Sequence, residues 1–490
     1  MFSFLSKILT GKLSGNSALA LTLFVSLLFF GCGGGNSYNG GSPAVIATYD
    51  VLFLDEDDSE IARLNKKLGS SITVPAATEK EGYEFEGWFE VGGEQTIAAG
   101  ETSYVVTGNV TFKVRYQYVG IFRVAFYGAE LDLLETDIVT KGDSIDLGAK
   151  KSKYGVGEWY QAKSSDPLEE SFTPDSDINL YAVPDIIEIS NQTELNGVRD
   201  NTSGSYLLIK DIELESTGDG FEGSAGWLPI GVAPSDPFVG IFNGNGYKIS
   251  GLWINRPQTY EVGLFKRIKG GTVKNLGVLI DDDNGGIKGE DNIGGIAGLI
   301  NTNSTIANSY SIGSVSGNNN IGGIAGYMQN SAIANSYSIG SISGNIGVGG
   351  IAAYVGDGSN ITNTYSKASV SGDMAVGGIA GYVFQSRVAN NAAINQEIIG
   401  SSGVNRIVGV VAAVNTISDN FALATMNVNG AQRFSDNAGG LDGADKTDAD
   451  FKSQETYEVD LSWSFDGENA SHPWKIDEGE SYPYFYWEDR

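Results

Sequence analysis

A short phrase recurs five times between residues 293 and 413, and its spacing constrains the fold more than any other feature of the chain. Successive copies begin 28, 27, 28 and 32 residues apart. The copies read IGGIAG from Ile293, IGGIAG from Ile321, VGGIAA from Val348, VGGIAG from Val376 and VGVVAA from Val408. A second phrase, for example IANSYSIG at 333–340, keeps the same phase. Two phrases locked in phase indicate one structural unit stacked on copies of itself.

The repeated unit carries the pattern of β-strands. In IANSYSIG, Ile333 and Tyr337 alternate with small residues, and Asn335 shares their phase. A period of two predicts a strand with one face of large residues. Pairs such as Ser343-Gly344 punctuate the units and mark turns. We therefore predict a mainly β chain whose second half is a right-handed parallel β-helix of roughly 28-residue coils, stacked about 4.8 Å apart.

Stacked coils place equivalent residues above one another. Because an Asn amide both donates and accepts, a column of Asn can hydrogen-bond along the stack. These ladders are either a ligand-binding stripe or a structural support, and we interpret them as structural. Only nine charged side chains occur in 290–430, as expected where like charges stack at a cost. The predicted ladders are Asn308, Asn335, Asn363, Asn390 and Asp419, and Tyr310, Tyr337 and Tyr365.

The repeated phrases resemble the GLUG repeat, which is named for a Gly-Leu-x-Gly-like core and found in bacterial surface proteins. Residues 238–252, with their NGNGY turn, resemble the start of such domains, and 463–487 resembles their tail. A solenoid needs covered ends, because exposed strand edges aggregate. The resemblance implies β-helix repeats over 255–430, a first cap at 185–254 and a last cap at 431–490.

The first residues have the pattern of an export signal. Two lysines precede an uncharged, mostly apolar run at 18–30, which is too short to span a bilayer comfortably. Cys32, which is the single cysteine of the chain, follows directly after Gly31. The arrangement resembles a bacterial lipoprotein signal, which implies removal of 1–31, lipid on Cys32 and a flexible tether over 32–47. The alternative is a plain signal peptide with an incidental cysteine.

Two copies of one small module precede the β-helix. Residues 48–118 and 121–183 match when Phe53 is aligned with Phe126 at an offset of 73. The offset falls to 71 and then to 68 further along. Small changes of offset at turn-rich segments are typical of loop deletions in a true repeat, so we predict two β-rich modules.

The first copy reads GYEFEGWFE at 82–90 and VTGNVTFKVRY at 106–116. It resembles the Listeria–Bacteroides repeat, an internalin B-repeat-like module. The resemblance implies a small strand-dominated fold that occurs in tandem on bacterial surface proteins. The second copy keeps Trp159 but reads KYGVGEWYQ, so it retains only part of the pattern. The aromatic residues are either an exposed binding pair or most of the module's core, and we interpret them as core.

The composition excludes several classes of chemistry. One histidine, His472, leaves no material for a Ser-His-Asp triad elsewhere in the chain, a His-Glu-x-x-His zinc site or a multi-His metal centre. A lipid on Cys32 would also exclude thiol catalysis. The formal net charge of −29 argues against nucleic acid as a partner. We expect no cofactor and no enzymatic activity.

Carboxylate chemistry is the catalytic option that remains, because many parallel β-helices cleave polysaccharides with paired acids or with Ca²⁺. The densest acidic cluster is Asp281, Asp282 and Asp283, which follows the TVKNLGVLI strand pattern. It is a candidate Ca²⁺ site. The cluster does not repeat at the coil period, however, and we interpret it as a solvated acidic loop.

The sequence therefore predicts an exported protein that is lipid-anchored at the bacterial outer membrane or cell surface. Its function would be adhesin-like binding of a glycan or protein through the β-helix, with the ligand unknown. This assignment rests on resemblance, since fold alone does not give function. Two alternatives stay open: a carbohydrate-active β-helix enzyme that uses carboxylates, and a purely structural surface spacer.

Overall fold

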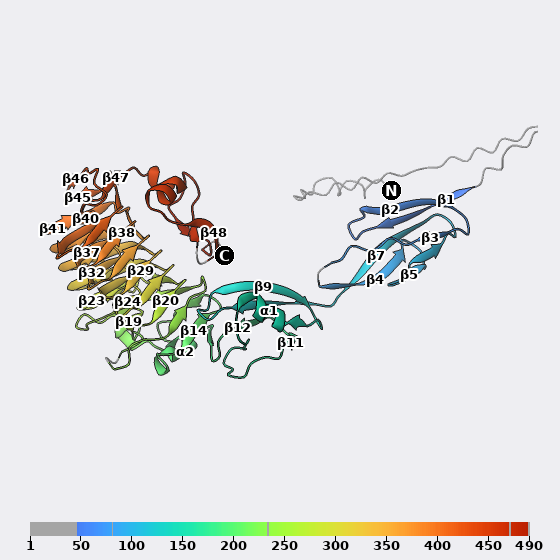
Figure 1. The fold of residues 1–490 in the computed structure, drawn as a ribbon, viewed down its shortest axis with the longest axis horizontal. Helices are drawn as coiled ribbons and strands as arrows, with labels where there is room; N and C mark the ends of the chain where they lie inside the picture. The colour runs from blue at the N-terminus through green and yellow to red at the C-terminus, as the bar shows by residue number, and fades with distance from the viewer. Residues whose placement is uncertain (1–46, 81, 233–234, 470–471, 489–490) are drawn as a thin grey trace, which may run out of the picture. The chain divides into compact units, whose positions relative to one another are not determined.

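The chain forms two compact units (Figure 1). The first unit comprises the described residues up to Ala77 together with Glu86–Arg115, and the second comprises Thr78–Phe85 and the chain from Tyr116 onward. The second unit contains a small β-module and a parallel β-solenoid, so the predicted mainly β fold is confirmed. The computed structural model describes residues 47–80, 82–232, 235–469 and 472–488.

The first module is built around three aromatic rings. The ring of Phe53 meets the edge of Trp88 at 5.0 Å and stacks on Phe112 at 5.5 Å, and all three side chains are buried. The strand β1 runs antiparallel to β2 and parallel to β7, in a sheet of order β2-β1-β7-β4-β5. The strands are β1 (Thr48–Leu54), β2 (Glu60–Lys67), β3 (Ser71–Thr73), β4 (Tyr83–Glu90), β5 (Thr96–Ala98), β6 (Ser103–Val105) and β7 (Val110–Tyr118).

The second module has the same aromatic contact, with Phe126 and Trp159 at 5.0 Å and an interplanar angle of 74°. A helix precedes Trp159 in this module, whereas Trp88 of the first module lies on the strand β4. Asp146 caps the first turn of this helix by accepting a hydrogen bond from Ala149 N (2.8 Å), and Gly155 ends it in the left-handed region. The elements are β8 (Ile121–Tyr127), β9 (Leu133–Thr140), β10 (Ile145–Asp146), α1 (Leu147–Tyr154), β11 (Ser171–Phe172) and β12 (Ile178–Tyr181).

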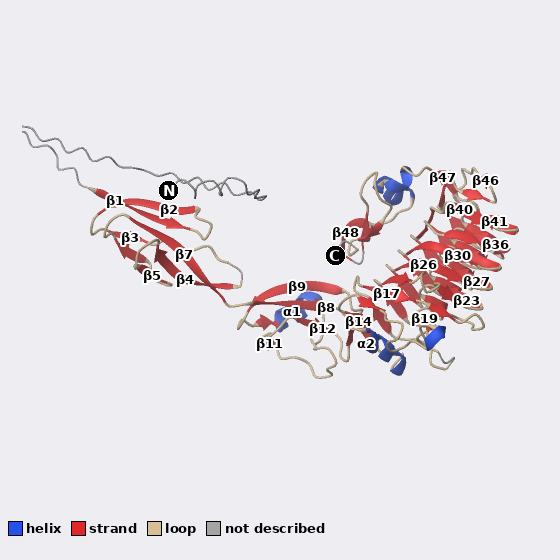
Figure 2. Cartoon of the chain, turned by 180° about the vertical axis from the view of Figure 1, so that it is seen from behind, coloured by secondary structure: helices blue, strands red, loops and turns tan. Residues whose placement is uncertain are grey.

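The solenoid stacks equivalent strands in parallel, as Figure 2 shows. One coil runs through β29 (Ala332–Ala334), β30 (Tyr337–Ser343), β31 (Ile346–Gly349) and β32 (Ala352–Gly356). Each strand pairs with the strand of the same rank in the next coil, so that Ile333 lies directly between Ile306 and Ile361. The inward side chains form one continuous hydrophobic core along the stack.

Across the described residues, four sheets of nine, fifteen, six and five strands make up the solenoid. The nine-stranded sheet contains β13 (Ile187–Ile189), β14 (Ser205–Leu208), β16 (Ile241–Asn243), β20 (Thr272–Lys274), β25 (Thr305–Ala307), β29, β33 (Asn360–Thr362), β38 (Arg387–Ala389) and β43 (Thr416–Ser418). The six-stranded sheet contains β19 (Phe265–Lys269), β24 (Ala297–Asn301), β28 (Ala325–Gln329), β32, β37 (Ala380–Phe384) and β42 (Val408–Ala412). The five-stranded sheet contains β23 (Asp291–Gly294), β27 (Asn319–Gly322), β31, β36 (Met374–Gly377) and β41 (Ser402–Asn405).

The fifteen-stranded sheet has one long path with shorter strands beside it. Its main path is β15 (Ile212–Glu213), β17 (Lys248–Leu252), β21 (Gly277–Ile280), β26 (Tyr310–Ser316), β30, β34 (Tyr365–Ser366), β39 (Ala392–Ala393), β44 (Phe421–Leu423) and β47 (Ala444–Lys446). The accompanying strands are β18 (Ile254–Asn255), β22 (Ile287–Lys288), β35 (Ser369–Ser371), β40 (Glu397–Ile399), β45 (Asn427–Val428) and β46 (Ala431–Gln432).

The phrase IANSYSIG is a corner, and the prediction of one continuous strand there is wrong. Asn335 adopts a left-handed backbone, with φ of 45°, between β29 and β30. Because Asn tolerates this region better than most residues, it bends the chain from one sheet into the next. The turn also changes the alternation, so that Ser336 and Tyr337 are both buried.

The glycine pair in IGGIAG permits a close approach of neighbouring backbones. A Cβ atom on Gly322 would lie 2.1 Å from the carbonyl oxygen of Ala325, and one on Gly323 would lie 2.2 Å from that of Gly350. No side chain fits at either distance. Inside the same corner, Ser311 Oγ donates to the carbonyl oxygen of Gly323 at 2.7 Å. The repeated phrase therefore specifies a corner at which Gly322 and Gly323 leave no room for side chains of their own.

The solenoid begins earlier than the sequence indicated. The segment 185–254, predicted as a cap, already contributes β13, β14 and β16 to the nine-stranded sheet. Ile189, Leu208 and Phe242 from these strands belong to the same core as the later coils. Their spacing differs from the regular repeat because α2 (Gln192–Gly197) and long turns interrupt them. The capping segment is therefore also the first part of the stack.

The second module packs on the outer face of these first strands. Tyr127, Leu131 and Tyr181 from the module and Leu207 from β14 form one buried cluster. Hydrogen bonds surround it: Asn243 Nδ2 donates to the carbonyl oxygen of Leu131 at 2.6 Å. An ion pair between Lys274 Nζ and Asp132 Oδ1 (2.8 Å) adds to the contact. The module is thus fixed to the solenoid by a small core of its own.

The predicted last cap, 431–490, divides into two parts with different positions. Residues 431–446 close part of the last coil, since β47 pairs with β44 and the carbonyl oxygen of Leu441 accepts from Ile407 N at 2.9 Å. Arg406 is fully buried there and bonds Asp445 Oδ1 through Nη2 at 2.7 Å. This part fits the prediction of a cap.

The C-terminal segment 447–488 lies along the flank of the coils instead of over their end, and this part of the cap prediction is wrong. Trp487 stacks on Tyr310 at 5.6 Å, and Trp474 lies 6.0 Å from the ring of Tyr365. Trp463 Nε1 donates to the carbonyl oxygen of Asn390 at 2.8 Å. The physical reason is the tyrosine column, because aromatic rings gain more by packing on one another than by remaining in water.

Candidate functional site

The asparagine ladder is a hydrogen-bonded column inside a corner of the solenoid. Asn308 Nδ2 donates to Asn275 Oδ1 at 3.0 Å, Asn335 Nδ2 to Asn308 Oδ1 at 3.1 Å, and Asn363 Nδ2 to Asn335 Oδ1 at 3.2 Å. The column starts at Asn243, whose Oδ1 accepts a hydrogen bond from Asn275 Nδ2 at 3.0 Å. These amides bond one another, so they offer little to a ligand.

The ladder differs from the prediction at both ends. Asn243 and Asn275 belong to it, although they lie before the regular phrase begins. Asn390 and Asp419 keep the left-handed corner, with φ of 60° and 53°, but the bonded column ends at Asn363. The carbonyl oxygen of the Asn363 side chain is buried without a hydrogen-bond partner among the described residues. The left-handed backbone therefore extends from Asn275 to Asp419, whereas the bonded amide column extends from Asn243 to Asn363.

The predicted tyrosine ladder forms a stack of rings, and the C-terminal segment covers this stack. Tyr310 and Tyr337 stack at 4.9 Å, and Tyr337 and Tyr365 stack at 4.7 Å. All three are at least 95% buried beneath the C-terminal segment. The Tyr337 hydroxyl donates to Glu488 Oε2 at 2.7 Å, and burial raises the pKa of Tyr337 and Tyr365 well above the usual value. Tyr337 and Tyr365 are thus part of the core, whereas Tyr310 also borders a hollow of about 310 Å³ beside Trp487.

In the acidic candidate 281–283, Asp281 and Asp282 form hydrogen bonds with neighbouring residues. Asp281 binds the backbone and side-chain nitrogen atoms of Asn284 at 3.1 and 2.6 Å, and Asp282 Oδ1 accepts from Ser314 N at 2.7 Å. These bonds shape the turn after β21. Within the ranges that the structure describes, no group of three His, Cys, Asp or Glu residues is placed to hold a metal ion. Cys32, the predicted lipidation site, lies outside the described residues.

A second tyrosine stack, which sequence reasoning missed, faces outward from the six-stranded sheet. Tyr327 and Tyr354 stack at 4.4 Å with an interplanar angle of 4°, and Tyr354 and Tyr382 stack at 5.5 Å. Register pairing continues this outer column to Leu299 before it and Val410 after it. Burial among neighbouring rings raises the pKa of Tyr354 to about 12. The signal was present, since the three tyrosines recur at steps of 27 and 28 residues.

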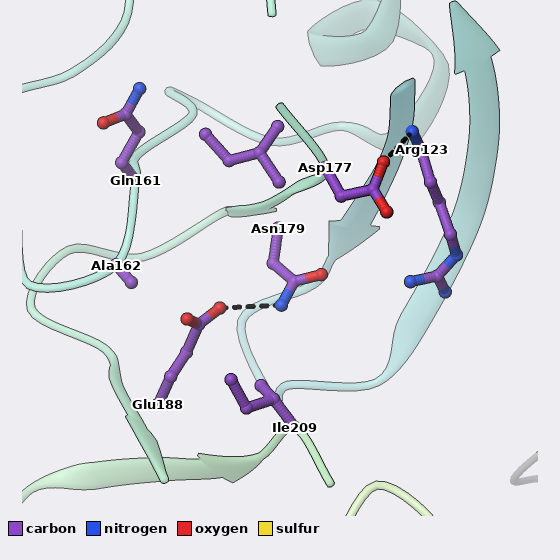
Figure 3. Close-up of a pocket in the computed structure, with 8 residues that line it drawn as sticks. Arg123, Gln161, Ala162, Asp177, Asn179, Glu188 and Ile209 are labelled. Atoms are coloured by element: carbon purple, nitrogen blue, oxygen red, sulfur yellow. Dashed lines mark hydrogen bonds between the residues drawn. The ribbon is translucent and has the colours of Figure 1, made fainter. Parts of the chain in front are cut away.

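A hollow of about 380 Å³ lies between the second module and the first solenoid strands (Figure 3). Asn179 and Glu188 are bonded to each other inside it, with Nδ2 to Oε1 at 2.7 Å. Asp177 Oδ1 accepts from the backbone nitrogen of Arg123 at 2.8 Å. No sequence pattern predicts this hollow, because its residues meet only when the module packs on the solenoid. Its wall is completed by Gln161, Ala162, Ile178 and Ile209.

The first module has a recognised family. Residues 49–113 match the family model of the Listeria-Bacteroides repeat domain, in agreement with the resemblance seen in the sequence. The match ends before the second module, whose relation to the first rests on the shared Phe–Trp contact and strand order.

Three curated proteins show local similarity. The chain is 30% identical over 128 residues to Halomucin of Haloquadratum walsbyi, which covers 26% of this chain and 1% of that protein. It is 38% identical over 96 residues to a protein of Evansella cellulosilytica described as a Gly-rich membrane protein, covering 19% of this chain and 11% of that one. A second E. cellulosilytica protein, described as a membrane protein, is 27% identical over 180 residues, or 35% of this chain and 25% of its own length.

The chain spans at most a quarter of the length of these relatives. Among the described residues, no helix is long and apolar enough to cross a membrane.

Proposed function

We propose that the protein is a surface-associated repeat protein with adhesin-like binding of a glycan or protein through its β-solenoid. The Listeria-Bacteroides repeat and the similarity to proteins described as membrane proteins support a place at the cell surface. The GLUG-like phrases and the long lateral surface of the solenoid support a presenting and binding role.

The observation that carries the proposal is the outward column from Leu299 through Tyr327, Tyr354 and Tyr382 to Val410. All five side chains are only partly buried, and none is charged. Five rungs spaced about 4.8 Å apart give a stripe roughly 19 Å long. The rings cover each other's faces, so the stripe presents ring edges and hydroxyl groups, which suits contact along an extended partner. Tyrosine is enriched at protein interfaces for its combination of apolar area and a polar tip.

The anchor is also part of the proposal. Cys32 follows a charged start and a short apolar run, and a lipid at this position would hold the protein at the bacterial outer membrane or cell surface. The tether and modules would then separate the solenoid from the membrane.

Two other functions compete with binding. A carbohydrate-active enzyme needs acids converging on one coil face, whereas Asp281 and Asp282 are engaged in shaping a turn. A pure spacer needs no outward apolar column. We therefore propose a non-enzymatic binding protein that acts without a cofactor.

The test is a glycan array and a protein pull-down with the full chain, repeated with a Tyr354→Ser and Tyr382→Ser double variant. We expect a specific ligand whose binding falls at least tenfold in the double variant. Tyr260→Ser is the matched control, because Tyr260 is 53% exposed and lies outside the column. Failure to bind any glycan or protein favours the spacer, and release of products from polysaccharide favours the enzyme.

A further inference from the structure

The hollow in Figure 3 lies against one face of a sheet, and the side chains on this face differ from one end of the strands to the other. In β8, Arg123, Ala125 and Tyr127 share a face, since alternate strand residues point the same way. The parallel pairing of β8 with β12 sets Asn179 beside Ala125 and Tyr181 beside Tyr127 on that face. The face is therefore polar at one end and aromatic at the other.

The aromatic end fixes the module on the solenoid. Tyr127 and Tyr181 stack at 5.5 Å and are buried with Leu207. A backbone hydrogen bond from Lys163 N to the carbonyl oxygen of Ile186 (2.8 Å) ties the next loop of the module to the chain that leads into β13. Because this junction is packed and bonded, the polar end keeps a defined shape before any ligand arrives.

At the polar end of this face, hydrogen bonds orient two carboxylate groups. Glu188 projects from β13 with the same facing as Leu207, its register partner in β14. One oxygen of Glu188 accepts from Asn179 Nδ2 at 2.7 Å and from the Tyr181 hydroxyl at 2.5 Å. Asp177 uses one oxygen for the backbone nitrogen of Arg123. Each carboxylate is thus positioned through one oxygen.

Hydrogen-bonding capacity remains in the hollow. Within the described part of the chain, the second oxygens of Asp177 and Glu188 accept no hydrogen bond. The Arg123 guanidinium forms no ion pair with any described residue, although the chain carries a net charge of −29. Ala162 and Ile209 supply aliphatic surface in the same wall. The hollow combines acceptors, donors and a small apolar patch.

We propose that this hollow is a binding site for a neutral saccharide, which goes beyond the proposed function because the hollow shares no residue with the outward tyrosine column. A sugar hydroxyl both donates and accepts, as a Ser hydroxyl does. Carboxylates accept only, guanidinium donates only, and the amides of Asn179 and Gln161 do both. The aliphatic wall suits the C–H face of a sugar ring, and about 380 Å³ lies within the roughly 300–1,000 Å³ range of small-molecule sites.

The charge balance excludes other classes of ligand. Two carboxylates against one guanidinium disfavour an anion such as a uronate or phosphate, because like charges repel at short range. The single pair of acids beside Arg123 is also a poor cation site, which needs more oxygen ligands. An uncharged polyhydroxy ligand pairs with all of these groups without burying an unpaired charge.

Isothermal titration of the full chain with maltotriose, cellotriose, chitotriose and trigalacturonic acid tests the site. We expect at least one neutral trisaccharide to bind and trigalacturonic acid to bind at least tenfold more weakly. Arg123→Ala and Glu188→Gln each reduce the affinity at least tenfold. Both changes preserve the fold, since the Arg123 side chain has no bonded partner and glutamine still accepts from Tyr181.

Matched controls are Arg387→Ala and Glu397→Gln, which make the same changes on later strands of the solenoid. Both keep wild-type affinity if the inference holds. Unchanged trisaccharide binding in the Arg123 and Glu188 variants, no binding of any neutral trisaccharide, or a preference for trigalacturonic acid overturns it. If the array ligand of the tyrosine column still binds in those cases, the proposed function stands; if it too is absent, both fail.

Discussion

At the scale of single residues, asparagine has two functions in this fold. Asn335 supplies a left-handed corner that most residues enter at a cost, and its amide bonds the coils on both sides. Sequence reasoning found the column through its period but assigned Asn335 to a strand, since alternation alone does not report φ. The outward stack at Tyr354 was missed for a related reason, because a period-two pattern does not say which face of a strand points into the core.

Asn335→Leu tests both functions of the asparagine. We expect a loss of about 1–3 kcal/mol in the free energy of unfolding from the broken amide bonds, and about 1–2 kcal/mol more from a non-glycine residue in the left-handed region. Asn335→Gly removes the amide but restores the backbone freedom, so it loses only the first part. Urea unfolding measures the difference. A Leu variant with unchanged stability and lost ligand binding identifies the ladder as a site.

Glu135 in the second module gives a pH-dependent contribution to stability. Hydrogen bonds from Lys150, Tyr154 and Lys153 lower its pKa from 4.5 to about 2. A depressed folded-state pKa contributes stability above the unfolded value, and this contribution is lost as the pH falls from about 4.5 towards 2. We expect Glu135→Gln to lower the melting temperature at pH 7 and to match wild type near pH 2. The exposed Glu130→Gln is the control, and a constant difference between pH 7 and pH 2 contradicts the assignment.

At the scale of elements, the regular coils were predictable and the contacts between irregular segments were not. The phrase IGGIAG repeats because each coil requires the same close backbone approach at Gly322 and its equivalents. No such repetition marks Leu207, whose outward side chain receives the second module, or Trp474, whose partner lies more than a hundred residues earlier in the chain. Pairs of this kind depend on which surfaces meet after the coils have stacked.

The C-terminal segment is predicted to act as a clamp on the tyrosine column. Trp474→Ala removes a fully buried ring that stacks on Trp463 at 4.8 Å and on Phe485 at 4.5 Å. We expect a cost of about 3–5 kcal/mol, which is typical of a buried Trp truncation. Phe434→Ala, at a site 73% exposed, is the control. Denaturant unfolding followed by circular dichroism measures both, and equal effects of the two changes mean that the clamp adds no stability.

At the scale of the whole molecule, the chain joins parts of different regularity. A module with a recognised family precedes a diverged copy, which is packed on the solenoid, and the solenoid ends in a segment that returns along its own flank. The proposed anchoring and the proposed binding are considered at this scale, because they involve different parts of the chain.

The lipid anchor is tested by Cys32→Ser. We expect the wild-type protein in the membrane fraction and the variant in the soluble fraction, since the serine cannot accept a thioether-linked lipid. Mass spectrometry of the wild-type N-terminal peptide should find Cys32 as the modified first residue. Gly31→Ser, which keeps a small residue before the cysteine, is the control and should remain in the membrane fraction. An unmodified thiol in soluble wild-type protein contradicts the prediction.

Removal of one whole coil tests whether the solenoid is a stack of interchangeable units. Deletion of Ile321–Gly347 joins Asn320 to Val348 and sets Tyr310 beside Tyr365 in the same register that Tyr337 now bridges. Coils contact mainly their neighbours, so we expect a folded, β-rich monomer. Its stability should fall, because the C-terminal segment spans three tyrosines and would have two.

The matched control deletes 321–334, the first half of the coil. This joins Asn320 to Asn335, so the chain lacks β28 and β29 and enters β30 out of the order that stacks equivalent strands. We expect the out-of-phase protein to aggregate, whereas the in-phase protein elutes as a monomer in size-exclusion chromatography and keeps its β spectrum in circular dichroism. Equal behaviour of the two deletions would mean that the period of the sequence is not the period of the structure. The coils would then not be equivalent stacked units, and the outward tyrosine column and the proposed binding surface depend on that stacking.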